Sequence, residues 1–205
     1  MSARVAAVDG GTYYHDDTLR GPRYRDRFDR TIYIRDLPAA DLSDIDILIA
    51  SCAADATSLA LARPVVDQLL ERGGTLVVMG ANNPNGWIDH HVKWQSAPSN
   101  WWWWLDPKAE SGLRVATGTH GLFKRMTLRD ATWHYHGQFA VPPGAVSLID
   151  CEYGGSILYD DRVTTPGRII ATTLDPFYHH GSQFMPAATR FLDAFLPWLK
   201  DGAPA

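Results

Sequence analysis

The sequence is poor in cysteine, in basic runs and in long apolar stretches. Its two cysteines, Cys52 and Cys151, cannot build a disulfide framework or a cysteine-rich metal knuckle. The net charge is −4 and no basic run extends beyond a few residues, which excludes electrostatic attraction to nucleic acid or to an anionic membrane. No apolar stretch approaches the ~20 residues that span a bilayer. The N-terminal MSARVAAVDGG leads directly into a candidate strand, so we expect no cleavable signal peptide and a cytoplasmic location.

What the sequence does have is a globular composition, with 45% apolar and 20% charged residues. A chain of 205 residues suits one substantial domain and is short for two. No internal repeat and no low-complexity linker divides it. We therefore expect residues 1–205 to form a single domain.

Short apolar runs alternate with helical patterns along the chain. A helical pattern lies between residues 55 and 72, where Pro64 marks either a kink or the first turn of a second helical piece. Another helix begins at Pro186. Strands are predicted at residues 5–8, 31–34, 45–50, 75–79, 132–141, 146–149, 156–159 and 168–173. This order predicts an α/β fold with a mostly parallel sheet, helices on both faces, and extra strands from residues 130–160.

Two segments carry a resemblance to a known family: IDILIASCAAD…RPVVDQLLERGGTLVVMG and GRIIATTLDPFYHHG…RFLDAFLPWL. They resemble class I glutamine amidotransferase-like domains, and more closely the trehalose-utilisation (ThuA-like) branch of that superfamily. Tyr14-His15-Asp16 is similar to the histidine-containing turn after the first strand of that branch. The resemblance covers nearly the whole chain and implies a flavodoxin-like fold with a carbohydrate or similar polyol as ligand.

The sequence departs from this family where the nucleophile should be. Amidotransferases place a cysteine on the turn after the LVV-type strand, and here that turn reads Met79-Gly80-Ala81-Asn82-Asn83. Cys52 ends the preceding strand instead, and Asp175-Pro176 stands where the family has its late His-Pro turn. A thiolate also needs a base close by, which the sequence does not place beside Cys52. We predict that the chain is not a conventional glutamine amidotransferase and that Cys52 is not a nucleophile.

Histidines and carboxylates gather where ligands of an open parallel sheet bind, outside the carboxyl ends of its strands. As catalytic candidates we expect His15, His134, His136 and Asp175, together with at least one of the pair His179 and His180, to line one pocket. Asp16, Asn82 and Asn83 come from the same loops and are candidate ligand-binding residues. The alternative, for each residue taken alone, is that its side chain only forms hydrogen bonds with the backbone of neighbouring loop residues.

The motif His134-Tyr135-His136 is the sharpest short pattern. Residues two apart on a strand point the same way, so both imidazoles would share one face. With Asp175 and His179 or His180 they would form a set suited to Zn²⁺ or Fe²⁺, the candidate metal ligands being His134, His136 and His179. Acid–base catalysis and simple packing in an aromatic layer are the alternatives. A divalent metal is therefore a possible cofactor.

Four consecutive tryptophans occupy residues 101–104. Trp101 and Trp103 would make a platform for a flat or sugar-like ligand, and an oligomer interface explains the run equally well. Several exposed indoles would form a large apolar patch on a monomer, so we expect at least a dimer.

Two functions follow from these patterns. The first is an enzyme, a hydrolase or a metal-dependent one, that acts on a small carbohydrate or polyol. The second is a non-catalytic binding or assembly domain that has lost the amidotransferase nucleophile.

Overall fold

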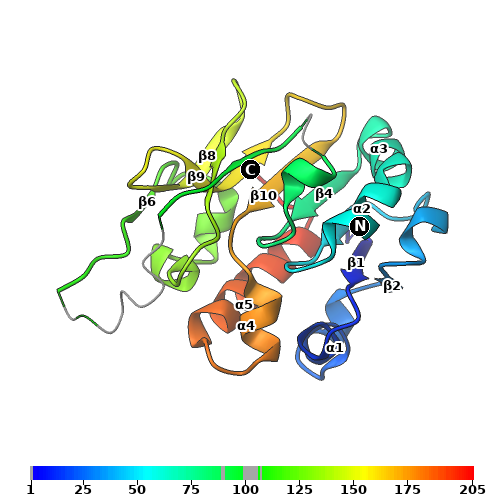
Figure 1. Ribbon diagram of the computed structural model, residues 1–205, viewed down its shortest axis with the longest axis horizontal. Helices are drawn as coiled ribbons and strands as arrows, with labels where there is room; N and C mark the ends of the chain where they lie inside the picture. Colours follow the sequence, from blue (N-terminus) through cyan, green and yellow to red (C-terminus); the bar gives the residue numbers. More distant parts are fainter. Residues whose placement is uncertain (1, 89–90, 99–105, 107) are drawn as a thin grey trace.

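The computed structural model describes residues 2–88, 91–98, 106 and 108–205. Within this part of the chain ten strands form one sheet, in the order β2-β1-β3-β4-β10-β9-β7-β5, with β8 paired to β9 and β6 paired to β8. Figure 1 shows β8 and β9 on the side of the molecule opposite to α1 and β2. Two predicted ligand-binding residues, Trp101 and Trp103, lie outside the described residues.

One half of the sheet is parallel. Its strands are β1 (Val5–Asp9), β2 (Arg30–Tyr33), β3 (Ile47–Ala50), β4 (Thr75–Val78) and β10 (Arg168–Thr172). The central strands are runs of apolar residues buried on both faces, as parallel sheets require. The expected parallel pairing of β3 with β4 is confirmed, with Ile47 opposite Thr75.

The other half is antiparallel. It contains β5 (Lys93–Gln95), β6 (Leu113–Val115), β7 (Gln138–Ala140), β8 (Val146–Cys151) and β9 (Ser156–Asp161). The extra strands expected from residues 130–160 are present, but the sheet is mixed rather than mostly parallel.

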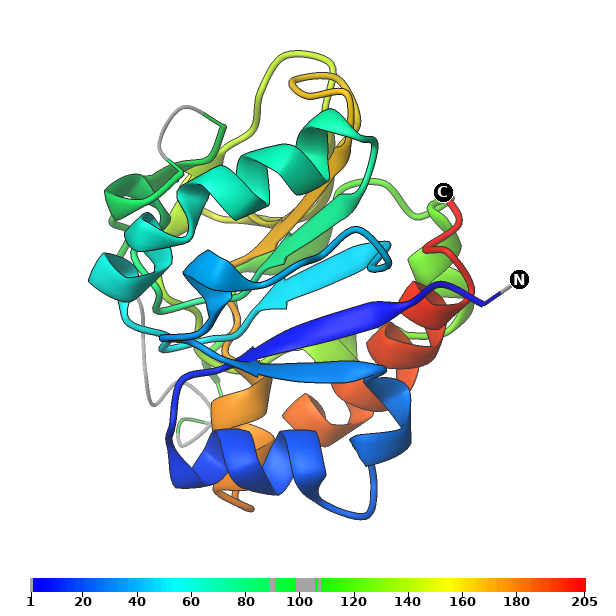
Figure 2. The ribbon, with the colours of Figure 1, turned by 90° about the vertical axis from the view of Figure 1, so that its right-hand side faces the viewer.

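Helices cover both faces of the sheet, as expected (Figure 2). On one face lie α1 (Tyr13–Arg20), α4 (Pro176–Gly181) and α5 (Pro186–Lys200). On the other lie α2 (Ala56–Leu61) and α3 (Arg63–Glu71). Alternate side chains of each strand enter opposite cores: Ile49 and Val77 pack toward α5, whereas Leu48 packs toward α3. Pro64 lies in the first turn of α3, so the second of the two predicted alternatives is correct.

Residues 132–141 differ from the prediction of a strand. Only Gln138–Ala140 pairs as β7, and residues 132–137 form an extended segment after a short 3-10 turn, Leu128–Ala131. The predicted alternation of faces holds within this segment, because Trp133 and Tyr135 are buried while His134 and His136 are partly exposed. The His136 N–H donates to the Thr173 carbonyl at 3.1 Å, which ties the segment to the end of β10.

Among the helices that the structure describes, none combines the length and the apolar character needed to cross a membrane.

Candidate functional site

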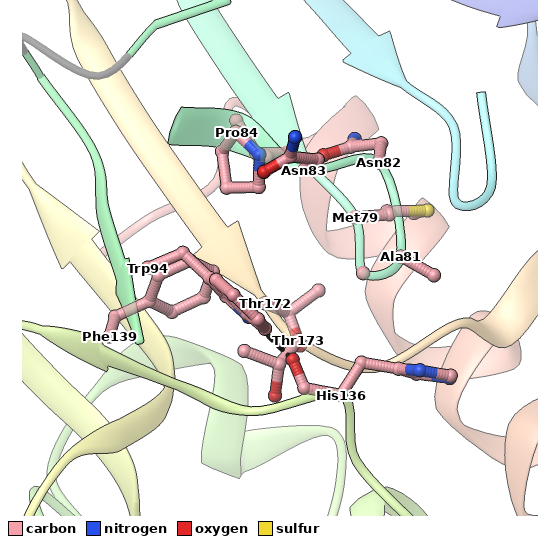
Figure 3. A pocket seen from close by; sticks show the side chains of 12 residues that line it. Met79, Ala81, Asn82, Asn83, Pro84, Trp94, His136, Phe139, Thr172 and Thr173 are labelled. Carbon is pink, nitrogen blue, oxygen red and sulfur yellow. Dashed lines mark hydrogen bonds between the residues drawn. The ribbon is translucent and has the colours of Figure 1, made fainter. Parts of the chain in front are cut away.

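A cavity of about 380 Å³ opens at the carboxyl ends of β4 and β10. Figure 3 shows its wall: Trp94 and Phe139 come from the antiparallel half, the turn after β4 supplies the opposite side, and His136 lies at the edge. The Trp94 indole N–H donates to the His136 carbonyl at 2.6 Å, which fixes the ring against the extended segment. The lining residues are Val78, Met79, Gly80, Ala81, Asn82, Asn83, Pro84, Trp94, His136, Phe139, Thr172 and Thr173.

The turn after β4 depends on Gly80. Its N–H donates to the Leu174 carbonyl at 2.8 Å, and a Cβ at this position would lie 2.1 Å from the Thr173 carbonyl oxygen. Glycine therefore allows the ends of β4 and β10 to converge. The next residue, Ala81, adopts φ +60°, a left-handed conformation that costs an alanine roughly 1–2 kcal/mol. Such strained residues concentrate at functional sites.

Two buried polar side chains of the cavity wall have no hydrogen-bond partner among the described residues. Asn82 is 1% exposed, and neither its amide oxygen nor its amide nitrogen is paired. The Thr173 hydroxyl is equally buried and unpaired. By contrast, the neighbouring Thr172 hydroxyl accepts the Leu174 N–H at 3.1 Å. An unpaired buried polar group costs about 1–3 kcal/mol, so Asn82 and Thr173 are the polar side chains of the wall whose hydrogen-bonding capacity is unmet among the described residues.

Behind the cavity, an indole N–H and several imidazole nitrogens converge on Asp175. Its Oδ2 atom lies 3.0 Å from the His136 Nε2 atom and 3.8 Å from the His134 Nε2 atom. Its Oδ1 atom accepts the Trp133 indole N–H at 3.0 Å and lies 3.2 Å from the His179 Nε2 atom. The structure thus brings His134, His136, Asp175 and His179 together, but of these four residues only His136 lines the cavity.

The Asp175 carboxylate carries its charge at neutral pH. Burial alone would raise the pKa of Asp175, but hydrogen bonding to His134, His136 and His179 outweighs burial and holds this pKa well below its usual range. A buried anion between imidazoles fixes the orientation of their rings. Because His136 also lines the cavity, the effect of the carboxylate reaches the ligand-binding space.

His15 does not join this cluster, and the prediction that it lines the common pocket was wrong. It is fully buried between the loops that follow β1 and β3. Its Nδ1 atom accepts the Gly10 N–H at 2.9 Å, so its Nε2–H donates to the Cys52 carbonyl at 2.9 Å. Both ring nitrogens are therefore occupied by backbone, and burial lowers the pKa of His15. A Cβ on Gly10 would lie 2.8 Å from the ring, which explains the glycine there.

Asp16 and His180 also point elsewhere. Asp16 is exposed on α1 and pairs with Arg20 at 3.0 Å. The His180 Nδ1 atom lies 2.9 Å from the Thr189 hydroxyl on α5, and its ring packs on Tyr24. Successive residues of the short helix α4 face different directions, so His179 turns toward Asp175 while His180 turns away.

Cys52 has the environment of a structural thiol. It is fully buried, and its Sγ atom accepts the Tyr178 N–H at 3.3 Å. Burial, with a smaller contribution from the negative charge of Asp175, raises the pKa of Cys52 far above the physiological range. This environment supports the expectation that Cys52 is not a nucleophile.

Sequence reasoning identified Asn82 and Asn83, which do line the cavity, but it missed part of the wall. Thr173 could have been found because it is the last residue of a predicted strand, whose carboxyl end faces the ligand side of the sheet. Trp94 and Phe139 had no such signal, since Trp94 lies in a segment without periodicity and Phe139 is one of the core aromatics.

No family model matches the sequence, and no curated protein matches it. Solved structures do resemble the fold. The Cytoplasmic Protein STM3548 from Salmonella typhimurium is 12% identical, with a TM-score of 0.61 over 95% of this chain and 98% of that one. A Thermoplasma acidophilum protein described as a component of GMP synthase is 12% identical, with a TM-score of 0.57 over 96% and 94%. A Bacteroides uniformis protein described as thua-like is 12% identical, with a TM-score of 0.54 over 98% and 93%. The chain therefore shares the α/β fold of proteins described as thua-like and as part of a GMP synthase.

Proposed function

We propose that this chain binds a neutral carbohydrate or similar polyol in the cavity beside β4 and β10 and acts on it through His136 and Asp175. The observation that carries the proposal is that His136 belongs to both the cavity wall and the cluster, 3.0 Å from the buried Asp175 carboxylate. An imidazole held by a carboxylate serves as a proton acceptor or as a metal ligand.

The wall of the cavity favours a neutral, hydroxyl-rich ligand. Its described lining residues include no aspartate, glutamate, lysine or arginine. The unpaired Asn82 amide offers a donor and an acceptor side by side, and the Thr173 hydroxyl offers both. Trp94 and Phe139 supply apolar ring surface that suits the C–H faces of a sugar. A volume of about 380 Å³ lies within the range of small-molecule sites.

We also assign the chain to the ThuA-like branch of the glutamine amidotransferase-like superfamily, as one flavodoxin-like domain without the elbow cysteine. The order β2-β1-β3-β4-β10 supports this, because it is the flavodoxin-like order with β10 as the fifth strand. The fold similarity to a thua-like protein over 98% of this chain supports it as well.

Isothermal titration calorimetry with a panel of neutral sugars and polyols tests the binding. We expect at least one neutral member of the panel to bind. Asn82→Ala should lower the affinity for that ligand about tenfold, because it removes hydrogen bonds worth roughly 1.4 kcal/mol. His136→Ala should abolish turnover of that ligand, whereas His180→Ala, a histidine outside the cluster, should keep it. Binding of charged ligands only, or equal effects of the two histidine variants, would refute the proposal.

A second candidate is a binding domain without catalysis. Ala81 supports this second candidate. The turn after β4 is strained at Ala81, but the side chain of Ala81 is a methyl group, which cannot act as a nucleophile. In that case a bound sugar would be recovered unchanged after long incubation, and His136→Ala would change its affinity without any turnover to lose.

We further propose a homo-oligomer, at least a dimer, located in the cytoplasm. The run of tryptophans at residues 101–104 supports the assembly, and similarity in fold to a protein named cytoplasmic supports the location. Light scattering at micromolar concentration tests the assembly, and a clean monomer would exclude it.

A further inference from the structure

We infer that His134, His136 and Asp175 form a binding site for a divalent transition metal, Zn²⁺ or Fe²⁺, at the edge of the cavity. This inference rests on the proposed function and names the group through which the cavity would act on its ligand. It is carried by the distances within the cluster, by the different partners of the two Asp175 oxygens, and by access from the cavity.

The three ligand atoms have the spacing of a coordination sphere. One ring nitrogen of each histidine and one Asp175 oxygen lie within 4.8 Å of one another. The Oδ2 atom is 3.0 Å from the His136 Nε2 atom and 3.8 Å from the His134 Nε2 atom. Metal bonds of ~2.0–2.1 Å put neighbouring tetrahedral ligands about 3.3 Å apart. The two distances from Oδ2 bracket this value, and the longer one must shorten by about 0.5 Å to hold an ion.

The two oxygens of Asp175 have different partners. Oδ1 is engaged by the Trp133 indole N–H at 3.0 Å and faces the His179 Nε2 atom at 3.2 Å. Oδ2 faces the two imidazoles of the His134-Tyr135-His136 motif. A carboxylate whose one oxygen is fixed by N–H donors, and whose other oxygen points at imidazole nitrogens, has the arrangement of a metal ligand with its supporting outer shell.

His134 also contacts the third imidazole of the cluster. Its Nε2 atom lies 3.0 Å from the His179 Nε2 atom, so only one of these two nitrogens carries the proton between them. Binding of a metal at His134 requires its Nε2 atom to be the one without a proton, and the ion would replace this contact.

The donor set and its access select the kind of ion. Two imidazoles and one carboxylate suit Zn²⁺ and Fe²⁺, whereas Mg²⁺ and Ca²⁺ prefer oxygen ligands. Three protein ligands leave coordination positions open for a substrate, as catalytic sites do. The His136 side chain is 23% exposed and lines the cavity, so His136 connects the metal site with the proposed polyol site.

The test uses the full chain, purified without a nickel column and treated with EDTA. Zn²⁺ and Co²⁺ are titrated by calorimetry, and Co²⁺ binding is followed by its visible absorption, which reports the ligand geometry independently of any activity. We expect one equivalent of each ion to bind. His134→Ala and His136→Ala should lower the affinity at least tenfold, and the matched control His180→Ala should leave it unchanged.

Two results would overturn the inference: no stoichiometric binding of either ion, or binding that the His134 and His136 variants do not weaken. Circular dichroism of each variant shows that it is folded, and His136 lies at the rim, where truncation removes little core packing. Polyol binding by the EDTA-treated protein separates this inference from the proposed function. Polyol binding without metal binding refutes the metal alone, and metal binding without polyol binding refutes the proposed ligand.

Discussion

Replacing Thr173 by valine tests whether the cavity wall is built for a ligand. Valine has nearly the same shape as threonine and carries a methyl group in place of the hydroxyl. In the structure that hydroxyl is buried, and it has no hydrogen-bond partner among the residues described. A polar group in this state costs about 1–3 kcal/mol. We expect Thr173→Val to recover about 1 kcal/mol, the lower end of this range, because valine fills the same space without an unpaired hydroxyl.

The neighbouring Thr172 provides a matched control. Its hydroxyl is also fully buried, but it accepts the Leu174 N–H at 3.1 Å. Thr172→Val would leave that N–H unpaired, so it should lower the free energy of unfolding by about 1 kcal/mol. The two substitutions remove the same group from adjacent residues and should act in opposite directions.

Thermal unfolding measures the difference. For a domain of this size 1 kcal/mol corresponds to roughly 2–4 °C in Tm. Thr173→Val should therefore raise Tm by about that amount, and Thr172→Val should lower it by as much. The Thr173 variant should also bind the polyol about tenfold more weakly, since one hydrogen bond is worth roughly 1.4 kcal/mol. A Thr173→Val protein that is less stable than the wild type would refute the reasoning.

The remaining predictions concern groups outside the cavity wall. Cys52→Ala should fold and keep its ligand affinity, and the wild-type thiol should react slowly with Ellman's reagent because it is buried and protonated. His15→Gln should lose about 1–2 kcal/mol of stability without a change in affinity, measured by urea unfolding and calorimetry, because its bonds go to backbone. Burial acts to raise the pKa of Asp160, but hydrogen bonds from His120 and Arg168 outweigh it and hold this pKa below that of the unfolded chain. The resulting stability is complete above about pH 4 and is lost as the pH falls further, so Asp160→Asn should flatten this part of a urea-unfolding pH profile.

The parallel half of the fold could be predicted from the sequence because its strands are short apolar runs bounded by clear breaks. The pairing of residues 45–50 with residues 75–79 followed from their spacing and from the helical pattern between them. The strands β5 and β6 could not be predicted, since three residues are too few to show a period of two. Their pairing depends on partners that are distant in the sequence.

The candidate site was predicted in part for similar reasons. The two-residue spacing of His134 and His136 placed them on one side of an extended segment, whether or not that segment pairs as a strand. Topology placed the loop of His15 at the correct edge of the sheet, but it could not show that the ring turns inward to Gly10 and Cys52. Which of two adjacent histidines faces Asp175 depends on the rotation of α4, which sequence spacing does not fix.

The position of the cluster explains how this fold could carry chemistry without a nucleophile after β4. In the pattern that the sequence resembles, the reactive group stands on that turn, where this chain has Ala81. Here the polar groups come instead from the end of β10 and from the segment before β7. These two parts of the chain are joined by a hydrogen bond from the His136 N–H to the Thr173 carbonyl at 3.1 Å. The imidazoles are thus held by backbone pairing and by a buried carboxylate rather than by a free loop. Groups fixed in this way need little reorganisation to act on a ligand, so the antiparallel half both extends the sheet and positions the candidate catalytic side chains.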